Sequence, residues 1–125
     1  MKRARVIIEH RAPDRPPIQV APGDEVTLGD RDDTWPQFVW TTLANGLGGW
    51  IPWVLFDREQ GEATAHTEYD TRELDADVGD VVVLHREMAD WWWAEKIQKG
   101  EAHGASGWIP AHALKIIDDG NTDGN

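Results

Sequence analysis

The sequence predicts an all-β protein built from two small and similar units of about five strands each. Short runs rich in β-branched and aromatic residues alternate with Gly, Pro, Asp and Asn, which is typical of strands joined by turns. Helix signals are scarce. Two short motifs recur in the same order in the two halves of the 125-residue chain, which indicates a repeated unit.

The predicted strands follow one another with short connections. In chain order they cover residues 5–10, 24–29, 38–43, 50–56, 62–69, 80–85, 91–97 and 108–117. The stretch from Ala111 to Lys115 follows Pro110 and is compatible with a single 3₁₀ turn. The chain has no cysteine, so each unit of roughly 55 residues must fold without a disulfide. A small barrel with closed or nearly closed edges explains how it can.

Two motifs carry the repeat. Gly-Asp occurs at 23–24 and at 79–80, each time before an apolar run, and Gly-Trp-Ile-Pro occurs at 49–52 and at 107–110. The two copies of these motifs start 56 and 58 residues apart, which chance similarity rarely produces. The predicted organisation is a first unit at 1–57, a short linker at 58–61, a second unit at 62–118 and a flexible acidic tail at 119–125.

Between the two motifs the copies diverge, and two alignments are open. One places Trp35 opposite Trp91. The other places Phe-Val-Trp-Thr at 38–41 opposite Trp-Trp-Trp-Ala at 91–94, with Trp40 opposite Trp93. We prefer the second alignment, because it matches an aromatic residue, a tryptophan two positions later and a small residue after it.

Composition limits the classes of partner. The net charge at pH 7 is −11, with −2 in residues 1–60 and −9 in residues 61–125. A surface this acidic repels phosphate backbones, so we expect a basic or neutral partner and no nucleic acid.

The start of the chain has only Val6, Ile7 and Ile8 where a signal peptide needs about 7 to 15 apolar residues. No run reaches the roughly 18 apolar residues of a membrane span, so we expect a cytoplasmic protein without a membrane partner.

The side chains that carry most enzyme chemistry show no catalytic or metal-binding pattern. The five histidines, at 10, 66, 85, 103 and 112, are not at the close spacing of zinc ligands. The single serine, Ser106, lies among small residues and not in a nucleophile elbow. Paired carboxylates such as Asp32-Asp33 have no apolar neighbours that would raise a pKa for acid–base work. We therefore expect neither enzyme activity nor a cofactor nor a metal.

The order of the motifs is similar to that of a Src-homology-3 (SH3) domain. In the second half the residues that carry this resemblance are Ala65, Tyr69-Asp70, Glu73-Leu74, Gly79-Asp80, Asp90-Trp91-Trp92, Ala94 and Gly107-Trp108-Ile109-Pro110. In the first half they are Gly23-Asp24, the aromatic residues at 35–40 and Gly49-Trp50-Ile51-Pro52. The chain looks like the bacterial proteins that contain two variant SH3 domains. This resemblance implies two SH3-like five-stranded barrels in tandem.

What the resemblance implies is a non-catalytic interaction module, in which the second barrel binds an extended basic or Pro-rich peptide. Such a peptide in polyproline-II conformation would lie on a groove of aromatic rings and a proline. The residues that would line this groove are Tyr69, Trp91, Trp108 and Pro110. The acidic residues that would pair with a basic group of the ligand are Glu68, Asp70, Glu73, Asp75 and Asp77.

Other functions stay open at this stage. The grooves of a structural two-barrel unit or homodimer could occlude each other, and the chain could be an accessory subunit of an enzyme. The loop at 10–19 contains Arg15-Pro16-Pro17, so one hypothesis is that the first unit presents this stretch to a second unit. We expect a monomer or a weak homodimer.

The run Trp91-Trp92-Trp93 needs a separate role for each ring, because neighbouring side chains of a strand point to opposite faces. With Trp91 at the groove and Ala94 in the core, Trp92 should point inward and Trp93 outward. Trp93 is therefore predicted to be covered by the other unit or the linker. The predicted interface residues are Trp40, Trp93 and Trp53.

Overall fold

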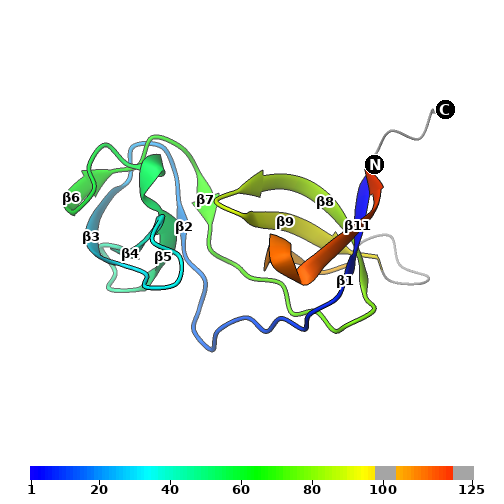
Figure 1. Cartoon of the computed structure of the whole chain (residues 1–125). Helices are drawn as coiled ribbons and strands as arrows, with labels where there is room; N and C mark the ends of the chain where they lie inside the picture. The colour runs from blue at the N-terminus through cyan, green and yellow to red at the C-terminus, as the bar shows by residue number, and fades with distance from the viewer. Residues whose placement is uncertain (98–103, 120–125) are drawn as a thin grey trace. The chain divides into compact units, whose positions relative to one another are not determined.

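The chain folds as an all-β protein with several antiparallel sheets (Figure 1). The computed structural model describes residues 1–97 and 104–119. Its elements are β1 (Lys2–Val6), β2 (Gln19–Val20), β3 (Glu25–Arg31), β4 (Phe38–Thr42), β5 (Gly48–Pro52), η1 (Trp53–Leu55), β6 (Gly61–Thr64), β7 (Tyr69–Asp70), β8 (Val81–Met88), β9 (Trp91–Lys96), β10 (Ser106–Pro110), η2 (Ala111–Ala113) and β11 (Leu114–Asp119). Here η denotes a 3₁₀ segment. No α-helix occurs among these elements, and none of the described residues forms a helix that could cross a membrane.

The chain divides into two compact units, but not at the predicted boundaries. Unit 2 is Arg15–Thr71, and unit 1 combines Met1–Asp14 with the chain from Arg72 onward. The prediction of consecutive units at 1–57 and 62–118 is therefore corrected. The supposed linker at 58–61 runs into β6, a strand that belongs to unit 2.

Unit 1 is organised around a five-stranded sheet in the order β10-β9-β8-β1-β11. Strands β8, β9 and β10 form an antiparallel meander, which is followed by the 3₁₀ segment η2 and by β11. The N-terminal strand β1 pairs with β8 on one side and with β11 on the other (Figure 1). Its alternate residues Ala4 and Val6 are buried in the core of this unit. The alternation matches the period of a strand with one buried face.

Unit 2 repeats this plan with different chain connections. Strands β3, β4 and β5 form the meander, η1 follows, and β6 pairs with β3 at the edge of a four-stranded sheet. The residue after η1, Phe56, forms an antiparallel bridge with Ala65 just beyond β6. A separate two-stranded sheet joins β2 to β7.

The pairing registers show that β1 and β6 occupy equivalent positions. Ala4 pairs with Val82 in unit 1 as Ala63 pairs with Val26 in unit 2. The backbone N–H of Gly79 donates to Val6 as that of Gly23 donates to Ala65. The first strand of each sequence repeat therefore completes the sheet of the other repeat. We call this reciprocal arrangement the strand exchange.

The registers also decide between the two alignments of the copies. Leu28 on β3 pairs with Thr41, and Leu84 on β8 pairs with Ala94. Thr41 and Ala94 are both completely buried. Trp40 and Trp93, which precede them, therefore correspond, and the preferred alignment is confirmed.

Several predicted elements differ from the observed ones. The 3₁₀ turn after Pro110 is confirmed at Ala111–Ala113, but the predicted strand at 50–56 ends at Pro52, where η1 begins. Asp119, predicted to begin the tail, belongs to β11, and the rest of the predicted tail, 120–125, lies outside the described residues. Among the described strands the pairing gives open sheets, without a closed ring of hydrogen-bonded strands in either unit.

Candidate functional site

The structure distributes the predicted groove residues over both units. Glu68, Tyr69 and Asp70 belong to unit 2, where Tyr69 pairs with Val20 and is only 5% exposed. The predicted residues that unit 1 contains are Glu73, Asp75, Asp77, Trp91, Trp108 and Pro110. A groove that uses both Tyr69 and Trp91 is therefore not formed within either unit, because β7, which carries Tyr69, follows the exchanged strand β6 and belongs to unit 2 with it.

His10 takes the position in unit 1 that Tyr69 has in unit 2. His10 forms an antiparallel bridge with Ala76, and Tyr69 forms the equivalent pair with Val20. The imidazole of His10 meets the indole of Trp91 edge to face, with ring centroids 5.4 Å apart and an interplanar angle of 78°. His10 is not among the residues predicted from the sequence to form the groove, because that prediction places residues 1–57 in one unit.

Trp91 stands at the start of β9, directly after a tight turn. Ala89 and Asp90 form this turn with φ angles of +54° and +70°, a left-handed conformation that suits two-residue hairpins. Trp91 pairs with Pro110 on β10, and the carbonyl of Asp90 accepts a hydrogen bond of 2.9 Å from the N–H of Ala111. Both sides of the turn are thus fixed, and the Trp91 ring is held half-buried beside His10.

The other tryptophans of unit 1 pack internally. Trp108 is 2% exposed, and its ring packs edge to face against Trp93 with centroids 5.4 Å apart. A ring this buried has little surface for a ligand, so Trp108 serves packing in this structure. Trp92 is half-buried against the core, as predicted, and the Lys2 ammonium lies 5.1 Å from its ring centroid.

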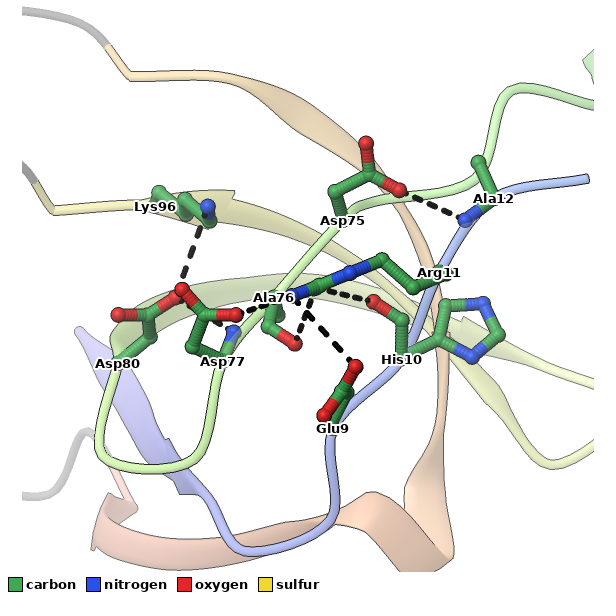
Figure 2. A network of polar contacts seen from close by, with 9 residues as sticks. All are labelled: Glu9, His10, Arg11, Ala12, Asp75, Ala76, Asp77, Asp80 and Lys96. Carbon is green, nitrogen blue, oxygen red and sulfur yellow. Dashed lines mark hydrogen bonds and ion pairs between the residues drawn. The ribbon is translucent and has the colours of Figure 1, made fainter.

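Three acidic residues of unit 1, Glu73, Asp75 and Asp77, contact the chain's own N-terminal segment, and Figure 2 shows the contacts of Asp75 and Asp77. We call residues Glu73–Asp77 the acidic strip and residues Met1–Asp14 the N-terminal arm. His10 Nε2 and Glu73 Oε1 are 2.9 Å apart, and the N–H of Ala12 donates to Asp75 Oδ1 at 2.7 Å. The guanidinium of Arg11 donates to Asp77. The arm therefore supplies a polar partner to each acidic side chain of the strip.

The contact between Arg11 and Asp77 changes the proton affinity of both groups. The hydrogen bond from Arg11 lowers the pKa of the Asp77 carboxyl, and the positive charge of the guanidinium adds to this effect. The same contact raises the pKa of Arg11. Both side chains are more than half exposed, so solvent screens the pair, and its main role is to position the arm.

The rings predicted to form an interface have partners within their own units. Trp40 packs against Trp50 with centroids 5.1 Å apart, in the same way that Trp93 packs against Trp108. The Arg31 guanidinium lies 5.1 Å from the ring centroid of Trp53. An interface role for Trp40, Trp93 and Trp53 stays a prediction.

The equivalent site in unit 2 is closed. Phe38 starts β4 as Trp91 starts β9, but Phe38 is only 7% exposed. It pairs with Pro52, which is buried, as Pro110 is in unit 1, so the two sites differ in the aromatic ring and not in the proline. The aromatic ring that remains accessible at this position is therefore that of Trp91 in unit 1.

Neither a metal-binding cluster among the described residues nor a similarity to a known protein indicates the function of this site. Within residues 1–97 and 104–119, no group of three or more His, Asp or Glu side chains is arranged to hold a metal ion. No family model, curated protein or solved structure matches the chain. The geometry around Trp91 therefore provides the basis for a functional proposal.

Proposed function

We propose that the chain is a non-catalytic interaction protein in which unit 1 binds an extended basic or proline-rich peptide across Trp91. The observation that carries this proposal is the half-buried indole of Trp91, which meets the ring of His10 edge to face. Aromatic rings of this kind form the surfaces on which polyproline-II segments pack. Pro110, which was predicted to line the groove, pairs with Trp91 but is itself buried. The equivalent aromatic residue in unit 2, Phe38, is buried, so the proposal concerns unit 1 alone.

The strand plan supports the further proposal that both units are SH3-like barrels. In each unit a three-stranded antiparallel meander is followed by one 3₁₀ turn, and a further strand pairs with the first strand of the meander. This sequence of elements is similar to the SH3 arrangement that the motifs imply. The strand exchange changes which part of the chain supplies one strand and leaves the plan of each unit intact.

The acidic strip supplies the electrostatic part of the proposed site. Glu73, Asp75 and Asp77 already contact the N-terminal arm, but a carboxylate accepts up to about four hydrogen bonds. The Asp77 side chain is 67% exposed, so it can accept a donor from a ligand while it keeps Arg11. A basic residue of the peptide would therefore bind at the outer side of the strip. Contacts of this shallow kind give affinities on the order of micromolar.

The proposed setting follows from composition. A chain without cysteine suits a reducing cytoplasm, where it would act as a monomer or weak homodimer. The acidic charge favours a basic protein partner over nucleic acid or an anionic membrane. An accessory role beside an enzyme is one form that such an interaction could take.

A second candidate function is structural, and a specific observation favours it. The contacts of His10, Arg11 and Ala12 with the acidic strip already satisfy part of the charge that a basic ligand would use. If these contacts are all that the strip provides, unit 1 is a rigid scaffold without a ligand. The two functions differ in whether Trp91 responds to a peptide.

Tryptophan fluorescence during peptide titration tests the proposal. We expect a peptide that contains Arg and several Pro to shift the emission of the wild-type protein, with half-saturation in the micromolar range. Trp91→Ala should weaken binding at least about tenfold, or 1.4 kcal/mol, while Trp53→Ala in unit 2 should bind normally. Urea unfolding of both variants checks that they fold. An unchanged wild-type emission up to millimolar peptide would favour the structural function.

A further inference from the structure

The N-terminal arm is held in unit 1 only by non-covalent contacts. Strand β1 lies between β8 and β11, and Arg3 forms an ion pair of 3.1 Å with Asp118 on β11. Beyond β1, the arm contacts the acidic strip through His10, Arg11 and Ala12. The chain then continues through all of unit 2 before unit 1 resumes at Arg72. The arm is therefore tied to the rest of unit 1 by non-covalent contacts alone, apart from the chain that passes through unit 2.

The segment that connects the arm to unit 2 suits a hinge. Pro13, Pro16 and Pro17 are exposed, and proline has no N–H with which to join a sheet. The segment is anchored at both ends: the N–H of Ala12 donates to Asp75, and the N–H of Ile18 donates to Thr71 Oγ1 at 2.8 Å. Between these anchors the prolines keep the chain extended, so a released arm would project away from the position it left.

Strand β6 shows what a tethered strand looks like. It fills the equivalent slot in unit 2, but the chain reaches it from Phe56 through a short turn that ends at Gly61. Phe56 is itself bridged to Ala65, so both sides of this turn are held in the same sheet. β6 therefore cannot pair with another molecule without opening its own sheet, whereas β1 can move with the arm alone.

We propose that the N-terminal arm exchanges between two copies of this chain. In the exchanged dimer, the arm of each copy fills the slot between β8 and β11 of the other copy. Every contact that β1 makes in the monomer is made again between chains, so the two states differ chiefly in the hinge and in the entropy of association. Two reciprocal exchanges close the assembly with twofold symmetry and leave no open edge for further growth. The dimer also places His10 of one copy beside Trp91 of the other.

Cross-linking of single-cysteine variants tests this proposal, since the natural chain has no cysteine. Arg5 and Val81 are register partners on β1 and β8, and such partners lie about 4.5 to 5.5 Å apart, within reach of a disulfide. The variants R5C and V81C are mixed, unfolded in urea, refolded together at increasing concentration and oxidised. We expect a covalent heterodimer of R5C with V81C, identified by mass, whose yield rises with protein concentration.

The matched control uses the tethered strand. Thr64 and Glu25 hold the equivalent positions on β6 and β3, so T64C mixed with E25C should give at least tenfold less heterodimer. Light scattering on the wild-type protein refolded at the same concentrations gives a second readout, a species of twice the monomer mass. Absence of the R5C–V81C product, or equal yields from the two pairs, overturns the proposal. A wild-type dimer that fails to give this product overturns it as well.

Discussion

Trp91 in unit 1 and Phe38 in unit 2 hold the same position in two copies of one plan, yet only Trp91 is accessible. Two residues, Ala89 and Asp90, connect β8 to β9, whereas the loop at 32–37 connects β3 to β4. Asp32 stabilises that longer loop by accepting hydrogen bonds from the N–H groups of Thr34 and Trp35, at 3.1 and 2.8 Å. The half-buried Trp91 thus follows a two-residue turn, whereas the buried Phe38 follows a longer loop.

The shared sheet plan does not by itself decide whether the aromatic ring at this position is accessible. The backbone registers at the two positions agree, and a proline is paired with the aromatic residue in each unit. What differs is the residue at the equivalent position that precedes the strip, a polar His10 beside Trp91 in unit 1 and a larger buried Tyr69 in unit 2. The proposed binding function of unit 1 alone rests on these local differences.

The largest effect is expected where the exchanged strand enters the core. Ala4 is fully buried in unit 1, and Ala4→Asp would bury a carboxylate without a partner, at a cost of about 3 kcal/mol or more. Because Ala4 packs with residues of the second repeat, the loss of hydrogen-exchange protection should fall on 74–97 and 104–114 and spare 18–56. Ala63→Asp should give the opposite pattern. Loss of protection in 18–56 from the Ala4 variant would contradict the strand exchange.

Truncation of the paired aromatic residues should separate binding from packing. Phe38→Ala removes a buried ring and should lower the free energy of unfolding by about 3 to 5 kcal/mol, with peptide affinity unchanged in the folded fraction. Trp91→Ala should cost less stability, since the ring is half-buried, and should lose the affinity instead. Urea unfolding and fluorescence titration measure the two quantities. If both variants lose affinity equally, the two units do not have the different roles described above.

Replacing the glycine of each Gly-Trp-Ile-Pro motif, Gly49 or Gly107, with alanine should lower the free energy of unfolding by different amounts. A Cβ at Gly107 would lie 2.7 Å from the carbonyl carbon of Glu73, so Gly107→Ala must displace backbone and should cost about 1 to 3 kcal/mol. A Cβ at Gly49 would meet the side chains of Ile18 and Thr71 at 3.1 and 3.2 Å, which can shift more easily. Gly49→Ala should therefore change stability by less than about 1 kcal/mol. Equal losses of unfolding free energy in the two variants, measured with urea, would contradict the close approach of the Glu73 backbone to Gly107 on β10.

The smallest effect concerns the pH dependence of the contact between the arm and the acidic strip. Arg11 lowers the pKa of Asp77 below its ordinary value of 3.8, so the folded state binds this proton less readily than the unfolded state. The pair therefore stabilises the fold above that pH, and the contribution is lost as the pH falls through the lowered pKa. Asp77→Asn removes it.

The stability difference between wild type and Asp77→Asn should accordingly be constant near neutral pH and shrink below pH 3.8. Urea unfolding at several pH values measures it. Asp30→Asn, an exposed substitution in unit 2, is the control. A difference that grows toward low pH would contradict the assignment of Arg11 as the partner of Asp77.

Apart from the strand predicted at 5–10, which is observed as β1 at Lys2–Val6, local patterns in the sequence were sufficient to predict the main strands, the two repeats and the alignment of Trp40 with Trp93. The 3₁₀ turn after Pro110 was also readable, because proline sets the first backbone angle of such a turn. These features depend on neighbouring residues, and the structure confirms them.

The strand exchange could not be predicted in this way. Strand β1 and the segment 61–65, which begins with β6, show the same alternation of buried residues, Ala4 and Val6 in one and Ala63 and Ala65 in the other, so the apolar pattern does not assign either of them to one slot. The choice depends on long-range pairing and on the prolines of the hinge, which a pattern of apolar residues does not report. For this reason the groove was predicted with Tyr69, and His10 was missed.

A single intrachain disulfide tests the strand exchange most directly. In the exchanged fold Arg5 pairs with Val81; if each repeat folded on itself, Arg5 would take the place of Thr64 and pair with Glu25. The double variants R5C/V81C and R5C/E25C can be oxidised in dilute solution, where monomers dominate, and the closed loop identified by mass after digestion. We predict a rapid disulfide in R5C/V81C and none in R5C/E25C, and the reverse result would contradict the strand exchange and the site that His10 forms with Trp91.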